Sequence, residues 1–411
     1  MNVTAQLRRL AAINPRTPEF RTASGEVTFV PLECVWPRGQ ADFTRRADVQ
    51  DVMENYTRFR RGDVLLPKVT PTFQAGRSTV ADIDTDLGAA TTEVHVLRET
   101  PRSEARFLAY LGQAQHFLSE GETVVVGVGN LLRVPQEWVK AFRVPVLTRD
   151  EQVLIADLLD AETGQIDAMI EAQTAVVRLT EELRLAAIAD ELDQPEVSDS
   201  PLVPLRQCLK IQTGVTLGKD YGAEAEEYPY LRVANVQAGY LDLTDVKTVA
   251  VSPSVAASST LRHADVLITE GGDRAALGRG ALWRDEIPGA LHQNHIFALR
   301  CDKTLDPEFL VYVLDSPAAR NYFESTRRQT TNLSSTNSMK VKAFKIPRPP
   351  IHQQRSIVRR LDEAVATIDE TLSAAKQVIA LLTERREALI TAAVMGLIDP
   401  HTGIERTEEA S

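Results

Sequence analysis

The stretch Val139-Lys140-Ala141-Phe142 occurs a second time, 202 residues later, as Val341-Lys342-Ala343-Phe344. The match continues without gaps, with 18 identities in the 50 positions that align residues 139–188 with 341–390. A repeat of half the chain length predicts two structural copies of one unit, related by an approximate two-fold axis. A protein with two similar heads is suited to hold two similar targets at a fixed separation.

The repeat extends upstream with a small drift in register. Gly62-Asp63-Val64-Leu65-Leu66 corresponds to Ala264-Asp265-Val266-Leu267-Ile268 at an offset of 202, whereas Leu7-Arg8 corresponds to Leu205-Arg206 at 198. Insertions and deletions in loops produce such drift. The repeat, together with proline-rich and acidic linker composition near residues 193–204, predicts four segments. They are head 1 (1–147), a helical spacer (148–200), head 2 (201–350) and a second helical spacer with a tail (351–411).

Both spacers have the apolar periodicity of long helices. In the second, Ile357, Leu361, Val365, Ile368 and Leu372 begin a stripe that runs to residue 389 without Gly or Pro. A stripe of this length requires a partner helix, and we expect the two spacers to pack antiparallel against each other. About 36 helical residues would span roughly 55 Å. The alternative is that each helix only covers the core of its own head.

The heads are predicted to be mixed domains, in an α+β fold with a pseudo-two-fold tandem repeat. Short β-rich runs punctuated by Gly and Pro predict strands, and longer runs near 104–118 and 307–326 predict helices. The strand runs are Val27-Thr28-Phe29-Val30, Val64-Leu65-Leu66, Thr123-Val124-Val125-Val126, Val266-Leu267-Ile268 and Ile296-Phe297-Ala298-Leu299.

Composition places the chain among ordinary globular proteins. Its 411 residues are 43% hydrophobic and 25% charged, enough for two or three domains with their own cores. We find no apolar run near the ~20 residues that cross a bilayer, and no signal peptide. The three cysteines, Cys34, Cys208 and Cys301, are far apart and odd in number, which predicts free thiols and a cytoplasmic location.

The net charge of −11 at first argues against a nucleic-acid partner, but the acid is concentrated in one segment. Residues 1–150 hold 19 Lys/Arg and 18 Asp/Glu, whereas residues 151–197 hold 2 and 12. Residues 198–350 hold 18 and 17, and residues 351–411 hold 7 and 10. Both heads are therefore near neutral, and each is able to present a basic face.

Motifs for catalysis are missing. The glycine-rich stretch from Gly271 to Gly280 lacks the Lys-Ser/Thr pair of a phosphate-binding loop, and Asn14-Pro15-Arg16 differs from the Asn-Pro-Pro-aromatic site of amino-methyltransferases. His292 and His295 have a spacing that metals use, but without a second ligand pair a surface or base-contacting role is favoured over zinc. We therefore predict no catalytic residues, no cofactor and no metal.

Several stretches resemble signature sequences of one family. Head 1 carries Gly62–Arg77 and Thr91–Arg98, and head 2 carries Tyr230–Val236, His292–Phe297 and Ile346–Pro350. The second spacer, from Gln354 to Asp399, resembles a distal conserved region. In these stretches, and in the order of heads and spacers over nearly the whole chain, the sequence resembles the specificity (S) subunit of type I restriction–modification systems, the HsdS family. Head 1 lacks a clear copy of Tyr230–Val236.

The resemblance implies a non-catalytic protein that recognises DNA. Each head would be a target recognition domain for one half of a bipartite, asymmetric double-stranded site, and the helices would set the spacing. The helices would also dock two adenine-methyltransferase subunits and, through that complex, an endonuclease/translocase subunit, with no membrane involved. Two alternatives are an S-like recognition protein of another defence or modification system, and a protein scaffold that does not bind DNA.

Base recognition in the major groove needs Arg or Lys for guanine and Asn or Gln for adenine, while Lys, Arg and Thr anchor phosphates. Polar clusters of this composition predict DNA contacts, against the alternative of solvated surface loops. The candidates are Lys68, Thr70, Thr72, Gln74 and Arg77 in head 1, and Lys219, Arg274, Arg279, His292, Gln293, Asn294, Arg327, Arg328 and Asn332 in head 2.

Overall fold

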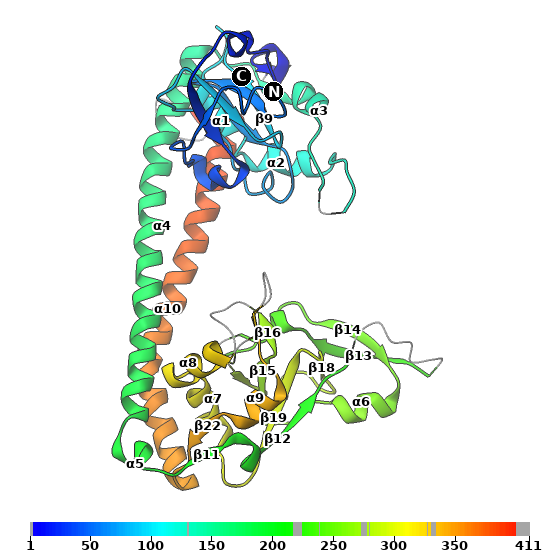
Figure 1. Ribbon diagram of the computed structural model, residues 1–411, viewed down its shortest axis with the longest axis vertical. Helices are drawn as coiled ribbons and strands as arrows, with labels where there is room; N and C mark the ends of the chain where they lie inside the picture. The colour runs from blue at the N-terminus through cyan, green and yellow to red at the C-terminus, as the bar shows by residue number, and fades with distance from the viewer. Residues whose placement is uncertain are drawn as a thin grey trace. The chain divides into compact units, whose positions relative to one another are not determined.

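The computed structural model describes residues 3–129, 131–216, 224–237, 239–272, 278, 280–326, 328–329 and 334–399 (Figure 1). The chain forms two compact units. Unit 1 is Met1–Thr174 together with Lys376–Ser411, and unit 2 is Ala175–Ala375. Two helices of 44 residues each, α4 (Arg149–Leu192) and α10 (Ile351–Val394), contribute to both units. Each unit thus combines one head with part of each long helix.

Head 1 contains two four-stranded sheets, with strand orders β2-β9-β6-β7 and β4-β3-β8-β5, and a separate β1–β10 pair. Three helices follow the sheets. The elements are β1 (Thr4–Gln6), β2 (Ala12–Ile13), β3 (Glu26–Val30), β4 (Arg46–Asp48), β5 (Thr57–Arg60), β6 (Val64–Pro67), β7 (Thr79–Val80), β8 (Leu87–Ala90), β9 (Val94–Arg98), α1 (Ala105–Leu111), α2 (Gln115–Glu122), α3 (Gln136–Ala141) and β10 (Arg143–Pro145).

Head 2 repeats this plan. Its sheets have the orders β12-β19-β15-β17, β14-β13-β18 and β16-β21-β20, and β11 pairs with β22. The elements are α5 (Pro195–Ser198), β11 (Leu202–Pro204), β12 (Leu209–Thr213), β13 (Glu226–Leu231), β14 (Lys247–Val251), α6 (Pro253–Ser259), β15 (Val266–Thr269), β16 (Gly271–Gly272), β17 (Gly280–Leu282), β18 (Leu291–His292), β19 (Ile296–Cys301), α7 (Pro307–Asp315), α8 (Pro317–Thr326), β20 (Arg328–Gln329), β21 (Ser334–Ser335), α9 (Ser338–Ala343) and β22 (Lys345–Pro347).

A buried ion pair occurs at equivalent positions of both heads. The Asp63 carboxylate precedes β6 and accepts from the Arg98 guanidinium at 2.7 Å, while Asp265 precedes β15 and accepts from Arg300 at 2.8 Å. Both carboxylates are almost fully buried. The strand registers agree as well, because Val64 faces Leu97 and Val266 faces Leu299. The predicted mixed fold with an internal two-fold repeat is therefore confirmed.

The first turn of each long helix carries a buried glutamine that ties the helix to its head. The side-chain amide of Gln152 donates to the carbonyl oxygens of Leu147 and Arg102, and its oxygen accepts from the Glu104 N–H. Gln354 makes the corresponding three bonds to Pro349, Thr304 and Asp306. A buried amide with all these partners satisfied is a strong orienting contact, so it aligns each helix with the head that precedes it.

The long helices run antiparallel within each unit, as Figure 1 shows and as their ion pairs establish. In unit 2, Arg184 of α4 meets Asp369 of α10 at 2.7 Å, while Arg360 of α10 reaches back to Glu191 at 2.6 Å. In unit 1, Arg386 meets Asp167 at 3.1 Å. The expected helix–helix pairing is confirmed.

The helix ends also complete the cores of the heads. In unit 1 the core around Phe107 and Phe117 includes Ile155 from α4 and Ile390 and Val394 from α10. In unit 2 the core includes Ile188 from α4 and Ile357, Leu361 and Val365 from α10. Each head therefore packs against the start of the helix that follows it and the end of the other helix. The alternative that a helix covers only its own head is wrong.

Several local predictions need correction. The run Thr123-Val124-Val125-Val126 is a turn followed by a single bridge residue, since Thr123 caps α2 and Gly127 turns the chain back. The predicted helix near 104–118 is two helices interrupted at Gly112, and that near 307–326 is interrupted before Pro317. The linker near 193–204 contains α5, whose Val197 is buried in the head 2 core.

Head 1 does contain a structural copy of Tyr230–Val236. In head 2 this segment is the end of β13 followed by the 3-10 helix Val233–Asn235, and in head 1 it is the end of β3 followed by the 3-10 helix Leu32–Cys34. Both strands pair in parallel with a second strand, β18 or β8. The copies share burial and turn geometry but almost no side chains, which explains why the sequence comparison missed this copy.

No helix in the described part of the chain is long and apolar enough to cross a membrane. Among the same residues, no group of three or more His, Cys, Asp or Glu side chains is placed to hold a metal ion. The three cysteines are free thiols, two of them buried. Burial raises the pKa of the Cys301 thiol well above its ordinary value.

Candidate nucleic-acid interface

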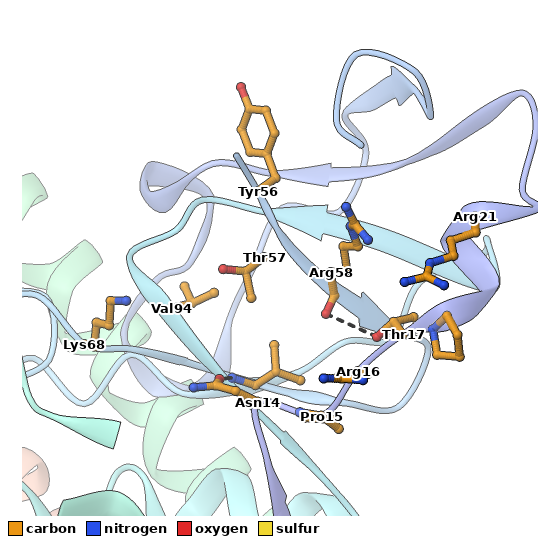
Figure 2. Close-up of a pocket in the computed structure, with 12 residues that line it drawn as sticks. Asn14, Pro15, Arg16, Thr17, Arg21, Tyr56, Thr57, Arg58, Lys68 and Val94 are labelled. Atoms are coloured by element: carbon orange, nitrogen blue, oxygen red, sulfur yellow. Dashed lines mark hydrogen bonds between the residues drawn. The ribbon is translucent and has the colours of Figure 1, made fainter. Parts of the chain in front are cut away.

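Head 1 has a concave cavity of about 820 Å³ whose lining is mostly polar and basic (Figure 2). Its walls come from the loop after β2, the 3-10 helix Pro18–Arg21, strand β5, the end of β6 and strand β9. The lining residues are Asn14, Pro15, Arg16, Thr17, Pro18, Arg21, Tyr56, Thr57, Arg58, Lys68, Val94 and Val96. We call this cavity the basic pocket.

Four cations line the basic pocket: Arg16, Arg21, Arg58 and Lys68. Among the described residues, none of them forms an ion pair with a carboxylate. Arg58 donates to the Met53 carbonyl oxygen and lies 5.6 Å from the centre of the Phe20 ring. Four cations around one hollow generate a positive potential that attracts a polyanion. Of the four, only Lys68 was predicted from the sequence.

Asn14 forms the rigid floor of the basic pocket. It has a positive φ of 49°, and its side-chain oxygen accepts from the Val96 N–H at 2.8 Å. Its amide nitrogen donates to Gln136 at 2.7 Å and to His95 Nδ1 at 3.0 Å. His95 Nε2 in turn lies 3.0 Å from the Val134 carbonyl oxygen, so this nitrogen carries the proton. The network joins the pocket floor to the segment before α3.

Burial lowers the pKa of His95 to about 4, and the same cause lowers the pKa of His292 in head 2 to about 4. In the unfolded chain a histidine takes up a proton near pH 6.5, whereas the folded chain resists it, so stability falls as the pH drops from about 6.5 towards 4. We expect each histidine to remove about 2 kcal/mol of unfolding free energy between pH 7 and 5.

Urea unfolding at both pH values tests this expectation for unit 2, because Trp283 is its single tryptophan and is buried. In a W36F/W138F background, Trp283 fluorescence follows unit 2 alone. H292Q should flatten the pH dependence of unit 2, and H95Q should leave it unchanged. Equal pH dependence of stability in H292Q and its parent would show that His292 does not cause the loss of stability at low pH.

The candidate residues after β6 separate into two groups. Lys68 lines the basic pocket, while Thr70 and Gln74 line a neighbouring cavity of about 550 Å³. Thr72 is buried, and the half-buried Arg77 donates to the Val35 carbonyl oxygen at 3.2 Å. The structure thus directs Lys68, Thr70 and Gln74 towards open cavities, and Thr72 and Arg77 towards the protein itself.

In head 2 the structure describes three candidates fully. The side chain of His292 is buried and its Nδ1 lies 3.0 Å from the Ile296 carbonyl oxygen, so it contacts the protein interior. Gln293 is half-buried and accepts from the Val233 N–H, and Asn294 is half-buried beside it. Arg328 lies in β20, and its side chain is outside the described atoms. Lys219, Arg274, Arg279, Arg327 and Asn332 lie outside the described residues.

The two heads differ in charge at one matched position. Lys68 follows β6, and Glu270, 202 residues later, follows β15 and accepts from His295 at 2.8 Å. A cation in one head and a carboxylate in the other favour different hydrogen-bonding partners. Two copies of one fold therefore present different recognition chemistry.

The long helices expose leucines at matched positions. Leu179 of α4 is 55% exposed in unit 2, and Leu381 of α10, at the offset of 202, is 65% exposed in unit 1. Leu183 is also exposed, one turn beyond Leu179. Exposed leucines thus recur at equivalent places on the two helices.

No family model matches the chain. It is 28% identical to the type I restriction enzyme EcoEI specificity subunit of Escherichia coli over 208 residues, which cover 47% of this chain and 34% of that protein. It is 22% identical over 312 residues to the EcoKI specificity subunit of Escherichia coli strain K12, covering 73% of this chain and 67% of that one. The chain thus spans about a third of the first relative's length and two thirds of the second's.

A solved structure from work on complex assembly and conformational transition of the type I restriction–modification system has the same fold. The superposition has a TM-score of 0.65 and covers 96% of this chain and 97% of that chain, at 17% sequence identity. At this identity the likeness concerns the fold.

Proposed function

Because this chain belongs to the family of type I restriction–modification specificity (S) subunits, we propose that its heads recognise the two halves of a bipartite, asymmetric DNA site. The observation that carries the proposal is the basic pocket of head 1, set in a duplicated fold whose other head has different chemistry at the same place. Arg16, Arg58 and Lys68 would hold backbone phosphates, and the polar side chains Thr70 and Gln74 would lie towards the bases.

The long helices would set the distance between the half-sites and dock the catalytic partners. Methylation would belong to two adenine-methyltransferase subunits, and cleavage to an endonuclease/translocase subunit held through the complex. Two partners of one kind require two equivalent surfaces, and Leu179 and Leu381 supply them on α4 and α10. The chain itself would make and break no bonds.

Co-expression with an adenine methyltransferase subunit of a type I restriction–modification system tests the proposal. Sequencing of the host DNA should show one new methylated motif with two specified parts and an unspecified gap. A host without a new motif would count against it. Recovery of a different enzyme in a pull-down would favour a recognition subunit of another defence system. Salt-insensitive binding to protein, with no DNA affinity, would favour a scaffold.

Charged substitutions of the exposed leucines should remove the methyltransferases one at a time. L179D or L381D should leave one bound methyltransferase in place of two, and the double variant none, since an unpaired carboxylate in an apolar interface is unfavourable. Native mass spectrometry of the co-purified complex counts the subunits. L202D, at an equally exposed leucine of β11, is the matched control and should keep both. Two bound subunits on the double variant would show that the partners dock elsewhere.

A further inference from the structure

Head 1 exposes a cluster of apolar side chains between α2 and α3. Val126, Val128 and Leu131 are 58%, 90% and 59% exposed, all within six residues. Single exposed apolar residues are common, but a contiguous group on one projecting segment marks an interaction site. We call residues 124–129 and 131–134 the apolar hairpin.

The hairpin has a defined turn. Val126 and Arg133 exchange both backbone hydrogen bonds, each 2.9 Å long. Gly127 has φ of 144°, and a Cβ there would lie 2.4 Å from the Leu131 carbonyl oxygen, so the turn requires glycine. Gly129 also has a positive φ, of 62°. Val128 therefore stands between two residues without side chains, in the turn that joins the two sides of the hairpin.

The hairpin is bonded to the segment that lines the basic pocket. The Val134 N–H donates to the Lys68 carbonyl oxygen at 2.8 Å, and the Thr70 N–H donates to that of Leu132 at 2.9 Å. Arg133 also forms a two-bonded ion pair with Glu93, at 2.7 and 2.8 Å. A duplex held by Lys68 would therefore meet the hairpin next.

The corresponding segment of head 2 indicates what the hairpin contacts. Between α8 and α9 the sequence is Arg327-Arg328-Gln329-Thr330-Thr331-Asn332, which is suited to base edges and phosphates. Between α2 and α3, head 1 has mainly valines and leucines in place of these polar residues. Two heads of one fold that both recognise DNA would use this segment for the same partner, so the apolar version favours an apolar feature of a base.

We propose that the apolar hairpin enters the major groove and that Val128 contacts the 5-methyl group of a thymine in the half-site of head 1. This inference rests on the proposed function. The major groove, ~12 Å wide, admits a two-stranded ribbon, and the thymine methyl is the one apolar group that bases present there. Valine matches this methyl, whereas hydrogen-bonding side chains distinguish the other base pairs. The hairpin is thus a specificity determinant that contributes no charge.

The test compares thymine with deoxyuridine, which lacks only the methyl group. The full chain, assembled with its methyltransferase subunits, is bound to duplexes carrying its methylated motif, with each thymine replaced in turn. At one or two positions the wild-type complex should lose about fourfold in affinity, the factor that ~0.8 kcal/mol for one buried methyl represents. V128S, whose side chain carries no methyl group, should lose this preference for thymine. V3S, at a valine 76% exposed elsewhere in unit 1, should retain it.

The possible results are distinct. If the wild type binds its motif but tolerates deoxyuridine everywhere, or if V128S keeps the wild-type preference, the methyl contact is wrong and the proposed function stands. If V128S loses methyltransferase subunits while its DNA preference is unchanged, the hairpin contacts protein and the inference is again wrong. Absence of any sequence-specific binding by the wild type would overturn the proposed function and this inference together.

Discussion

R184M is expected to lower the unfolding free energy of unit 2 by about 2–3 kcal/mol, which is large for a single substitution. Arg184 of α4 is largely buried and binds the carboxylates of both Asp315 and Asp369. Asp315 is buried at the end of α7 and also accepts from Arg320 at 2.7 Å. Loss of Arg184 leaves a buried carboxylate with fewer compensating charges. Because Arg320 still pairs with Asp315, the loss of unfolding free energy should be smaller than for a buried carboxylate without any partner.

Unit 1 provides a comparison for this joint between head and helix. Its equivalent of Arg184 is Arg386, which forms an ion pair with Asp167. Its equivalent of Asp315 is Gln113, whose Oε1 lies 3.4 Å from the Arg386 guanidinium. An amide oxygen thus occupies the place of the carboxylate. We expect D315Q to be tolerated better than R184M, because the amide oxygen can still accept from Arg184 while no buried charge is left unpaired.

Urea unfolding followed by Trp283 in the W36F/W138F background measures both effects in unit 2. R178M is the matched control, because Arg178 lies on the same helix in an exposed ion pair with Glu182 and its loss should leave the midpoint unchanged. Equal midpoint shifts in R178M and R184M would contradict this role of Arg184. A larger loss of unfolding free energy in D315Q than in R184M would contradict it too.

Removal of two cations from the basic pocket should weaken DNA binding about 10–100-fold at physiological salt. Arg16 and Lys68 line opposite parts of the pocket in Figure 2 and have no carboxylate partner among the described residues. If each neutralises one phosphate, R16M/K68M should also reduce the slope of log affinity against log salt by about 1.8. The weakening should be similar for cognate and non-cognate duplexes, because phosphates carry no sequence.

R143M/R149M is the charge-matched control for this experiment. Both arginines lie near the start of α4, where Arg143 donates to Thr4 and Arg149 pairs with Glu99 at 3.7 Å. Fluorescence anisotropy at several salt concentrations gives affinity and slope for both double variants. An unchanged salt slope in R16M/K68M would remove the basic pocket from the DNA surface. Equal losses in both double variants would attribute the effect to overall charge.

The repeat made the fold accessible from sequence. Val139–Phe142 and Val341–Phe344 lie at the ends of α3 and α9, so their offset of 202 aligns the two heads and both long helices. Gln152 and Gln354 are also identical residues at this offset, but the sequence does not reveal their structural role. Only the structure shows that each amide satisfies the backbone groups where a head meets its helix.

The candidate site was predicted less well, because its residues come from distant segments. Arg16, Arg58 and Lys68 share no local pattern, and only the packing of β2, β5 and β6 brings them around one hollow. Thr72 and Arg77 were selected for their chemistry, which does not reveal that the fold turns them inward. The valines at 124–126 predicted a strand, but the glycine turn that follows them produced an exposed hairpin.

The shared cores impose an order on folding while the chain is being synthesised. Unit 2 is one continuous stretch, Ala175–Ala375, so it has all its residues once that length has left the ribosome. Head 1 is made earlier, but its core contains Ile390, Ala393, Val394 and Ile398 from near the end of the chain. Domains usually fold in the order in which they emerge. Here the N-terminal head stays incomplete until the last helix arrives, and a truncated product would expose its unfilled core to chaperones and proteases.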